Sequence, residues 1–465
     1  MHFGVVVDHP KRDLPGAVML ASAFAVRGAR TSIVPLYEQG TDVPLLGLDA
    51  LLVNFARPAN LDLVDGYRAM GLPVYVLDTE GGVLTDTGAN SPGKLAAYVR
   101  DSGFRELLAG YFFWGSTLQQ RFVADSGMPA GLLRVSGCPR FDYASPRWSD
   151  LLRFERSGYV LVNANFPLVN PLFVRSPEAE RDSLVRAGWD RAYVDQMLTD
   201  LKCILAGYLA TVKALAAARP QQAFLVRPHP FEDISTYQRA FAALPNVIVD
   251  GRGSVLNVIR HARCIVHLNC GTSIEATMLR RLPLSLEFLN TPLMARHGPL
   301  PSRISAQVGS AAEALDAIDD VDARTSAFPF EQHYRESILP WFHKNDGQAA
   351  DRIAEAILDD VGSGHRVRRS VSWSLGSSRR RSRLSQRLQA LAANLLGSAT
   401  TSALRSRAAA VRREKRFGSA EITAAVQAIA AHDRRPQPRC RAAGHPWTGA
   451  TLASVTVTPA GASEE

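Results

Sequence analysis

The chain has 465 residues, 46% of them hydrophobic, and a formal net charge of +9 at pH 7. This length is too great for one ordinary hydrophobic core and predicts two domains with an additional segment. No segment reaches the roughly 18 to 20 uninterrupted apolar residues of a membrane span, and the layout of a signal peptide is absent, so we expect a cytoplasmic protein.

The amino-terminal part alternates short apolar runs with helical stretches such as residues 16–27. Apolar runs of this length predict buried strands. They span residues 4–7, 31–36, 50–54, 73–77, 111–114 and 133–136. The dinucleotide fingerprint Gly-x-Gly-x-x-Gly does not follow the first run, where Asp8-His9-Pro10 stands, so a nicotinamide cofactor is not expected.

A polar segment rich in glycine, Asp78-Thr79-Glu80-Gly81-Gly82, ends the fourth predicted strand. A carboxylate beside two glycines can approach a substrate closely, and Glu80 would take a proton from an acceptor hydroxyl. Asp78 is a second candidate, for orienting the substrate. The alternative is a turn that uses Asp and Gly for its backbone geometry.

A second set of short apolar runs begins after Pro146-Arg147-Trp148. These predicted strands span residues 159–163, 223–227, 247–249, 264–268 and 284–286. Strands that alternate with helices predict an α/β fold with parallel sheets covered on both faces.

Two such sets predict two doubly wound, Rossmann-like domains that face a central cleft. We place the amino-terminal, acceptor-side domain at residues 1–152 and the nucleotide-binding domain at residues 153–362. Ligands of such folds bind at the carboxyl ends of the strands, so the site is expected in the cleft.

Arginine and histidine stand together where the predicted strand 223–227 ends, in Arg227-Pro228-His229-Pro230. The two prolines would hold the imidazole in place with little entropy left to lose on binding. An imidazole can donate to a phosphate oxygen, and the guanidinium of Arg227 offers a planar fork for the same anion. The alternative is a structural turn with an incidental histidine.

The predicted strand 264–268 leads into a second polar segment, residues 269–276, and then into a helix over residues 274–281. Thr272 and Glu275 have the spacing of a capping box. The same helix start could hold a phosphate on its N–H groups, with Glu275 accepting from a ribose hydroxyl. The predicted donor contacts in this segment are Asn269, Gly271, Thr272, Ser273 and Glu275.

The positive charge is concentrated at the carboxyl end. Residues 365–465 contain 18 Lys and Arg against 5 Asp and Glu, whereas residues 1–364 contain 35 against 39. We expect residues 363–465 to form a basic extension rich in Arg, Ser and Ala, partly helical or disordered, that ends in a weakly structured Thr, Ala and Gly stretch.

Within this extension, leucines recur at helical spacing beside Arg383 and Arg387, at positions 384, 388, 391 and 395. This pattern is typical of a basic amphipathic helix that lies on an anionic membrane surface. The alternative is a solvated extension without a specific partner. Nucleic-acid binding is not favoured, because the basic clusters are not interleaved with aromatic residues.

Five cysteines are scattered along the chain and never form a Cys-x-x-Cys pair. Their odd number and spacing argue against a disulfide framework and against a structural zinc site. We expect reduced, mostly buried thiols at Cys138, Cys203, Cys264, Cys270 and Cys440.

Five segments taken together resemble landmarks of bacterial surface carbohydrate biosynthesis proteins. In chain order they are residues 78–82 (Asp-Thr-Glu-Gly-Gly), 137–142 (Gly-Cys-Pro-Arg-Phe-Asp), 162–166 (Val-Asn-Ala-Asn-Phe), 227–230 (Arg-Pro-His-Pro) and 270–276 (Cys-Gly-Thr-Ser-Ile-Glu-Ala). These proteins are similar to GT-B glycosyltransferases that use CMP-activated acidic sugars, notably the Kdo transferases of capsule and lipopolysaccharide assembly. The resemblance covers roughly residues 1–360.

The resemblance implies a role for each matching position. His229-Pro230 would contact the donor phosphate, residues 272–275 would hold the rest of the nucleotide, and Glu80 would be the catalytic acid or base. The acidic motif usually carries two adjacent acids, and here the first is Thr79. Arg140, Asn163 and Asn165 would orient the sugar or the acceptor, or would be loop residues tied to backbone carbonyls.

The resulting hypothesis is a metal-independent sugar transfer in which Arg227, His229 and the helix after Gly271 neutralise a cytidylate-type leaving group. No Asp-x-Asp segment or His/Cys cluster at metal-ligand spacing is present in the sequence, and no cofactor besides the nucleotide-sugar donor is expected. The acceptor would be a glycan or a lipid-linked glycan at the inner leaflet of the membrane. The stereochemistry stays open.

Two alternatives remain at this stage. A CDP-polyol phosphotransferase of the teichoic-acid type also resembles the chain in its Arg-x-His-Pro turn and its Ser/Thr-Glu helix start. A non-catalytic assembly protein with a GT-B-like scaffold would explain the missing second acid at Thr79.

Overall fold

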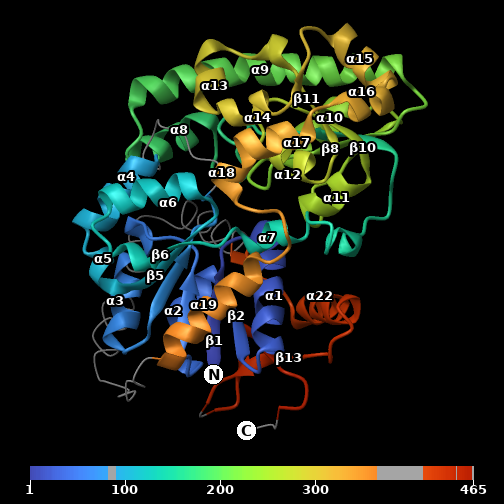
Figure 1. Cartoon of the computed structure of the whole chain (residues 1–465). Coiled ribbons are helices and arrows are strands. Elements are labelled where there is room, and N and C mark those ends of the chain that lie inside the picture. The colour runs from blue at the N-terminus through green and yellow to red at the C-terminus, as the bar shows by residue number, and fades with distance from the viewer. Residues whose placement is uncertain (82–90, 364–411, 447, 463–465) are drawn as a thin grey trace, which may run out of the picture.

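Two lobes, each built on a parallel β-sheet, face each other (Figure 1). The computed structural model describes residues 1–81, 91–363, 412–446 and 448–462. The structure confirms the two sheets that the sequence predicts. The predicted amphipathic helix around residues 384–395 lies outside the described residues.

The first lobe contains an eight-stranded sheet with the order β13-β14-β2-β1-β3-β4-β5-β6. Its six parallel strands match the six predicted apolar runs. They are β1 (His2–Val7), β2 (Arg30–Pro35), β3 (Ala50–Val53), β4 (Val74–Leu77), β5 (Leu108–Phe113) and β6 (Leu133–Val135).

Alternate side chains of these strands enter two separate apolar clusters, because successive residues of a strand point to opposite faces. Val5 and Val7 pack with α1 (Pro10–Val26) on one face. Val6 and Val53 pack on the other face, under α3, α4 and α6. Those helices span Leu61–Ala69, Pro92–Asp101 and Ser116–Asp125.

The second lobe contains a six-stranded parallel sheet with the order β12-β11-β10-β7-β8-β9. The strands are β7 (Tyr159–Asn163), β8 (Phe224–Arg227), β9 (Val247–Val249), β10 (Ala262–His267), β11 (Leu282–Ser285) and β12 (Ala306–Gln307). Helices α9 (Arg191–Ala218), α10 (Ile234–Phe241) and α15 (Ala311–Asp319) pack on one face, and α11 (Val255–His261) and α12 (Thr272–Met278) pack on the other.

Helix α9 is long and apolar enough to cross a membrane by length and composition alone. In this fold, however, Tyr208, Val212 and Leu215 on one side of it are buried against the sheet of the second lobe. The structure therefore places α9 as a core helix of that lobe.

The chain returns to the first lobe after residue 338, which corrects the predicted second domain at residues 153–362. Helix α18 (Leu339–Phe342) crosses over, and α19 (Ala349–Ser363) packs against α1 and α7 (Pro139–Asp142). Gly115 permits the crossing, because a Cβ atom there would lie 2.3 Å from the carbonyl oxygen of Pro340. The sequence could not show this, because α19 lies far in the chain from the lobe that it joins.

The end of the extension is also folded, which corrects the prediction of a weakly structured stretch. Helix α22 (Ser419–His432) packs on α1, and β14 (Thr451–Thr458) joins the edge of the first sheet, antiparallel to β2. Strand β13 (Arg439–Gly444) then pairs with β14. Val457 is fully buried, because alternation of Val with Ser and Thr in β14 points its apolar side chains inward.

Asp142 ties the returning helix to the first lobe. Its two carboxylate oxygens accept from the backbone N–H groups of Ala349 and Ala350 at the start of α19, both at 2.9 Å. Burial raises the pKa of this carboxyl to about 7, against the opposing effect of the two hydrogen bonds. Between about pH 4 and 7 the carboxyl group of Asp142 is therefore protonated in the folded protein and ionised in the unfolded chain.

A pH-dependent stability follows from this shift. The stability that protonation of Asp142 contributes is present below about pH 4 and is lost as the pH rises through 7. We expect Asp142→Asn to gain stability relative to the natural protein between pH 5 and 8, on a scale of about 1.4 kcal/mol for each unit of pKa shift. Urea denaturation of the natural protein and of Asp142→Asn at pH 5 and at pH 8 measures the difference in their free energies of unfolding. A difference that is the same at both pH values would contradict the raised pKa of Asp142.

Candidate functional site

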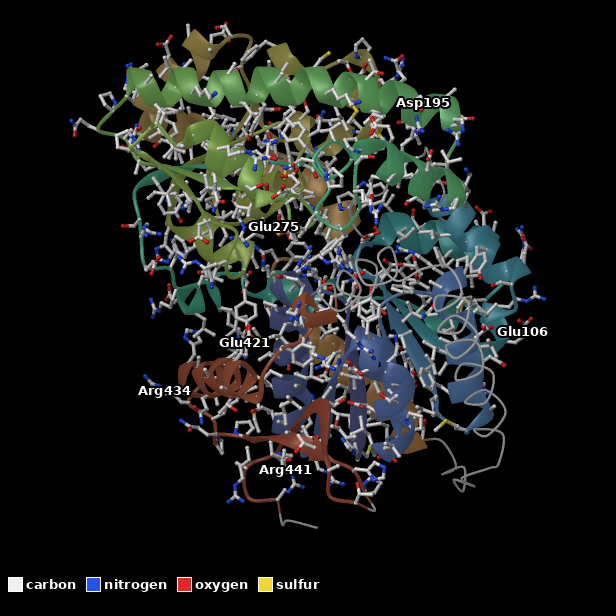
Figure 2. All side chains as sticks on the ribbon, turned by 180° about the vertical axis from the view of Figure 1, so that it is seen from behind. Glu106, Asp195, Glu275, Glu421, Arg434 and Arg441 are labelled. Atoms are coloured by element: carbon white, nitrogen blue, oxygen red, sulfur yellow. The ribbon has the colours of Figure 1, made fainter. Side chains whose placement is uncertain are left out.

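A cavity of about 330 Å³ opens between the two lobes, at the carboxyl ends of both sheets. Its volume lies in the range of small-molecule sites. Figure 2 shows Glu275 at the junction of the lobes and Glu106 and Asp195 toward the outside of the molecule. The predicted residues that line the cavity are Glu80, Arg140, Asn163, Asn165, Arg227, His229, Gly271, Thr272 and Glu275.

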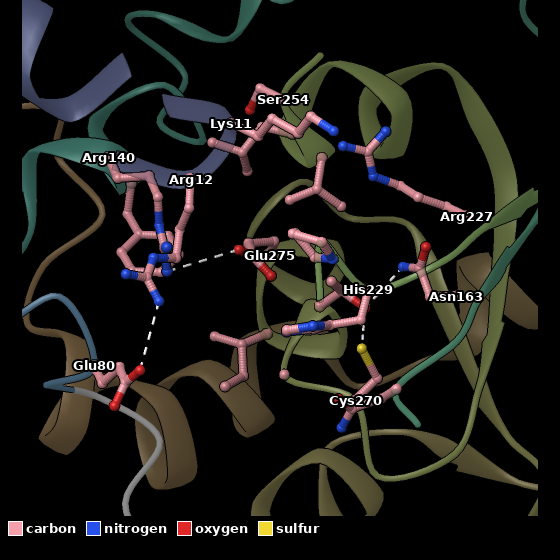
Figure 3. A pocket seen from close by; sticks show the side chains of 18 of the residues that line it. Lys11, Arg12, Glu80, Arg140, Asn163, Arg227, His229, Ser254, Cys270 and Glu275 are labelled. Atoms are coloured by element: carbon pink, nitrogen blue, oxygen red, sulfur yellow. Dashed lines mark hydrogen bonds and ion pairs between the residues drawn. The ribbon is translucent and has the colours of Figure 1, made fainter. Parts of the chain in front are cut away.

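His229 enters this cavity from the loop after β8 (Figure 3). Its Nδ1 accepts a hydrogen bond from the backbone N–H of Phe231 at 3.2 Å, which puts the ring proton on Nε2. Burial, with a smaller contribution from the charge of Arg12, lowers the pKa of the imidazole to about 4. The ring is therefore neutral at physiological pH and offers Nε2–H as a hydrogen-bond donor.

Glu232 holds the loop that carries His229, and the sequence analysis missed it. Its buried carboxylate accepts from the backbone N–H of His229 at 3.2 Å, from the hydroxyl of Tyr237 at 2.8 Å and from the backbone N–H of Phe166. A glutamate shortly after a Pro-His-Pro turn was the available signal. Because it satisfies two backbone donors, Glu232 fixes the position of the imidazole.

Arg227 lines the cavity, but its guanidinium is engaged elsewhere. It donates to the backbone carbonyl oxygens of Arg252, at 2.7 Å, and Gly253 in the loop before α11. Burial lowers its pKa to about 10. These hydrogen bonds hold the loop that carries Ser254, and the contact of Arg227 with the donor phosphate stays a prediction.

The start of α12 differs from the predicted capping box. Gly271 is the N-cap, and no side chain caps the helix. Thr272 Oγ1 instead accepts from Asn163 Nδ2 at 2.7 Å and lies 3.1 Å from the Sγ atom of Cys270. Glu275 is buried, and burial raises the pKa of its carboxyl, which lies 3.9 Å from Arg140.

Asn269 and Ser273, two of the predicted donor contacts, do not line the cavity. Asn269 has a left-handed backbone with φ of 48°, and its side chain donates to Asn290 Oδ1 at 2.9 Å. Ser273 is fully buried. The backbone conformation of the turn before α12 determines which of these side chains face the cavity, and this conformation cannot be read from the residue types alone. Asn165 lines the cavity and donates to the carbonyl oxygen of Asn269 at 3.1 Å.

On the first lobe, Glu80 lies at the edge of the cavity between two arginines. Its carboxylate is 3.6 Å from Arg12 and 3.4 Å from Arg57, and 44% of its side chain is exposed. Asp78 is buried beside it, 3.0 Å from Arg57, and accepts the backbone N–H of Glu80 at 2.9 Å. Asp78 does not line this cavity; it holds Arg57 and Glu80 in place, and its predicted role in orienting the substrate stays a prediction.

Arg140 reaches the cavity from the first turn of α7. Its guanidinium lies over the rings of Trp114, at 5.3 Å, and Phe141, at 4.6 Å. Gly16 in α1 permits this approach, because a Cβ atom there would lie 2.9 Å from the backbone nitrogen of Arg140. The guanidinium is thus stacked on these rings and points toward Glu275 on the other lobe.

The first β–α junction also contributes cations to the cavity that were not predicted from the sequence. Lys11 and Arg12 line the cavity just after β1. Arg12 is committed to Asp8, at 2.8 Å, and to Asp13, at 2.8 Å. Lys11 has no ion pair within the described part of the chain. The signal was available, since these cations follow a strand end just as Arg227 and His229 do.

A chain of charges connects the carboxyl-terminal extension to this site. Lys415 is buried and lies 2.5 Å from Asp8, which in turn binds Arg12, and Arg12 reaches Glu80. Its ammonium group also lies 5.9 Å from the centre of the Phe231 ring, in the His229 loop. The extension is therefore part of the support of the cavity.

All five cysteines are free thiols, and Cys138, Cys264 and Cys270 are buried, as the sequence predicts. Within the described ranges, no three His, Cys, Asp or Glu side chains are grouped to hold a metal ion. A metal-independent reaction stays a prediction.

Solved structures of other proteins share this architecture. The wall teichoic acid polymerase TagF aligns with a TM-score of 0.51 and 10% identity, over 77% of this chain and 88% of that one. The UDP-GlcNAc 2-epimerase of Neisseria meningitidis, bound to UDP-GlcNAc, aligns with a TM-score of 0.48 and 13% identity, over 77% of this chain and 100% of that one. The sequence matches no protein-family model and no curated protein.

The likeness to TagF defines the fold of this chain as GT-B-like, with two Rossmann-like lobes and a cleft between them. At this identity it shows the fold alone.

Proposed function

We propose that the protein is a glycosyltransferase of bacterial surface polysaccharide biosynthesis that transfers a sugar from a nucleotide-activated donor to a glycan acceptor. The observation that carries this proposal is the convergence of His229, Lys11 and Arg140 on one cavity between two Rossmann-like lobes. These three side chains supply a neutral donor and two cations at a site where an anionic leaving group would sit. Groups fixed in this way stabilise charge as it develops.

The favoured donor is a CMP-linked acidic sugar such as Kdo. Such a donor carries one negative charge on its phosphate and another on the sugar carboxylate. His229 Nε2–H would donate to the phosphate, and Arg140 would face the carboxylate as a planar fork. Glu275, beside Arg140, would accept from a hydroxyl of the ribose or the sugar.

The reaction breaks the bond between the anomeric carbon and the phosphate oxygen, and the electron pair stays on the departing CMP. The acceptor hydroxyl forms the new bond to that carbon and gives its proton to a base on the first lobe. Glu80 is the carboxylate at the edge of the cavity for this step, and Arg12 and Arg57 hold it in place.

A CDP-polyol phosphotransferase is the second candidate, favoured by the likeness of the fold to TagF, a wall teichoic acid polymerase solved with CDPG. Both reactions release CMP. Transfer of a polyol phosphate leaves phosphorus in the product, whereas transfer of a sugar does not, so phosphorus analysis of the product separates them.

We further propose a cytoplasmic location with the basic extension directed toward the inner membrane, where each Lys or Arg near an anionic surface contributes about 1 kcal/mol. No cofactor is required besides the donor. The proposed partners are the donor and a glycan or lipid-linked glycan acceptor.

The first experiment is a thermal-stability screen of the protein with CMP, CDP, UDP and GDP. A ligand at one hundred times its dissociation constant adds about 2.7 kcal/mol to the free energy of unfolding. We expect CMP or CDP to stabilise the protein more than the uridine and guanosine nucleotides do. Arg140→Ala should reduce the shift given by a CMP-linked acidic sugar more than the shift given by CMP. If no nucleotide stabilises the protein, the proposed function is wrong.

A further inference from the structure

A second cavity lies beside the first, between α1, α11 and α22. It has a volume of about 670 Å³, about twice that of the first. Helix α22 belongs to the carboxyl-terminal extension, so this cavity exists only because the extension folds back onto the first lobe. Three residues line both cavities: Lys11, Ser254 and Leu256.

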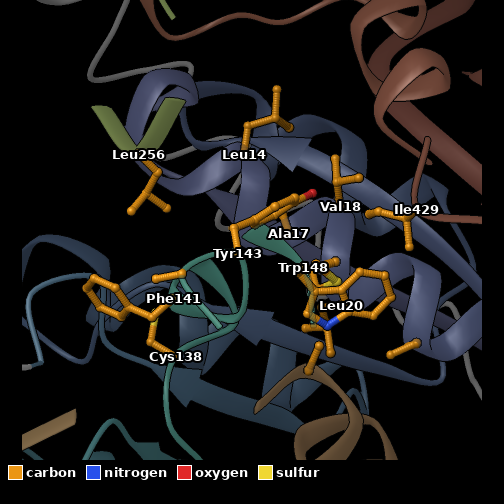
Figure 4. Packing of buried hydrophobic residues seen from close by; sticks show 14 of the residues in the cluster. Leu14, Ala17, Val18, Leu20, Cys138, Phe141, Tyr143, Trp148, Leu256 and Ile429 are labelled. Carbon is orange, nitrogen blue, oxygen red and sulfur yellow. The ribbon is translucent and has the colours of Figure 1, made fainter. Parts of the chain in front are cut away.

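The floor of the second cavity is apolar. Leu14 and Val18 come from α1, Tyr143 and Leu152 from the segment after α7, and Leu256 from α11. Figure 4 shows Leu14, Val18 and Tyr143 near one another, with Ile429 of α22 beside Val18 and Leu256 on the side away from α22. On α22 itself, Ala425 and Ala428 line the cavity, and their small side chains leave its space open.

Four cations line the rim of the second cavity, Lys11, Arg252, Arg413 and Arg416, against Glu414 and Glu421. Arg252 also pairs with Asp250 and Arg416 with Glu38, so among the described residues Lys11 and Arg413 are the rim cations that remain for a ligand. An apolar floor under a basic rim complements a ligand with a hydrocarbon chain and an anionic head. Lys11 stands where the two cavities meet, so it is placed to pair with that head.

The charge of the rim also indicates which kind of molecule could occupy the second cavity. Residues 364–411 of this chain contain ten Arg and no Lys, Asp or Glu, so they would bring only positive charge to a basic rim. An anionic lipid is complementary to it. Because Lys11, Ser254 and Leu256 line both cavities, the head of such a lipid would lie beside the first cavity, which His229 and Glu80 also line.

We propose that the second cavity binds the hydrocarbon chain of a lipid phosphate that carries the acceptor, with its phosphate beside Lys11. This inference rests on the proposed function, because it identifies the acceptor of the transfer as lipid-linked. The lipid would lie in the second cavity while the glycan or hydroxyl that it carries reaches the first.

The test is isothermal titration calorimetry of the full chain with octyl, decyl and dodecyl phosphate below their micellar concentrations. Each buried methylene should tighten binding by up to about fourfold. Dodecyl phosphate should bind more tightly than dodecyl maltoside, which has the same chain and no charge. Equal affinities along the series, or equal affinities for the two head groups, would overturn the proposal.

A matched pair of variants on α22 tests the location. Ala428→Trp places a large ring in the cavity and should weaken dodecyl phosphate binding at least tenfold. Gln427→Trp places the same ring on an exposed neighbour that does not line the cavity, and should bind as the natural protein does. Equal affinities of the two variants would show that the lipid binds elsewhere, for example on the Arg-rich surface.

Nucleotide stabilisation of the same three proteins reports on the first cavity separately. If nucleotides stabilise the protein but no alkyl phosphate binds, the lipid inference fails and the proposed function stands. If alkyl phosphates bind with the expected dependence but no nucleotide does, the proposed function fails and the second cavity remains a lipid site.

Discussion

Replacing His229 by alanine is expected to lower turnover by about two to three orders of magnitude, the cost of removing one fixed donor to a developing negative charge. The substitution removes the Nε2–H group from the cavity and the hydrogen bond from the backbone N–H of Phe231 to Nδ1, while Glu232 still accepts the backbone N–H of residue 229. Steady-state kinetics with the donor found in the nucleotide screen measure the effect, which should appear mainly in kcat.

The protonation state of His229 also predicts how the rate depends on pH. With its pKa lowered to about 4 by burial, the imidazole acts as a neutral donor throughout the physiological range. Its contribution to the rate should therefore be constant between about pH 5.5 and 8, where the ring is neutral and keeps its Nε2–H. A rate that depends on an imidazolium at position 229 and declines through pH 6.5 would show that the assigned role is wrong.

Two further variants serve as controls for His229. Glutamine at position 229 keeps an N–H donor and should recover part of the lost activity, which a purely structural histidine would not require. His297→Ala removes another partly buried histidine, which bonds to Tyr193 away from the cavity, and should leave turnover unchanged.

Replacing Lys415 by methionine is expected to have the largest effect on the fold. Loss of one partner from a buried ion pair costs about 3–5 kcal/mol, and we expect the lower end because Asp8 keeps its pair with Arg12. The lost contact lies where the extension meets the first lobe. Hydrogen exchange should therefore quicken in α22 and β14, and chemical denaturation should show a lower free energy of unfolding.

Arg412 provides the matched control for this second variant. It pairs with Glu38 in the same segment, but half of its side chain is exposed, so Arg412→Gln should cost less than about 1 kcal/mol. Asp8→Asn combined with Lys415→Met should recover part of the loss, since no carboxylate is then left without Lys415. Equal effects of the two single variants would mean that Lys415 does not anchor the extension.

The sequence predicted the two sheets well because buried parallel strands have a clear signature. Residues 159–163 and 247–249 form strands with the predicted bounds. Their apolar runs are short and bounded by polar residues, and no tertiary contact is needed to recognise them. Strand β14 was missed, although Val455 and Val457 alternate with Ser and Thr, because its partner β2 lies more than 400 residues earlier.

The candidate site was predicted in outline for a similar reason. In a parallel sheet the carboxyl ends of all strands share one edge, so polar residues after β4, β8 and β10 had to approach one another. Side-chain direction was not predictable in this way. Arg227 turned toward the carbonyl oxygens of residues 252 and 253, and Asn269 toward Asn290.

The amino-acid sequence by itself determined the α/β class, the two sheets and the edge at which the polar residues collect, because hydrophobic periodicity and strand-end chemistry are local properties. Only the tertiary structure decided that Lys11 and Arg140 join His229, that α19 returns to the first lobe, and that the extension supports the cavity through Lys415. These features depend on contacts between residues distant in the chain, and their geometry is fixed by packing between lobes.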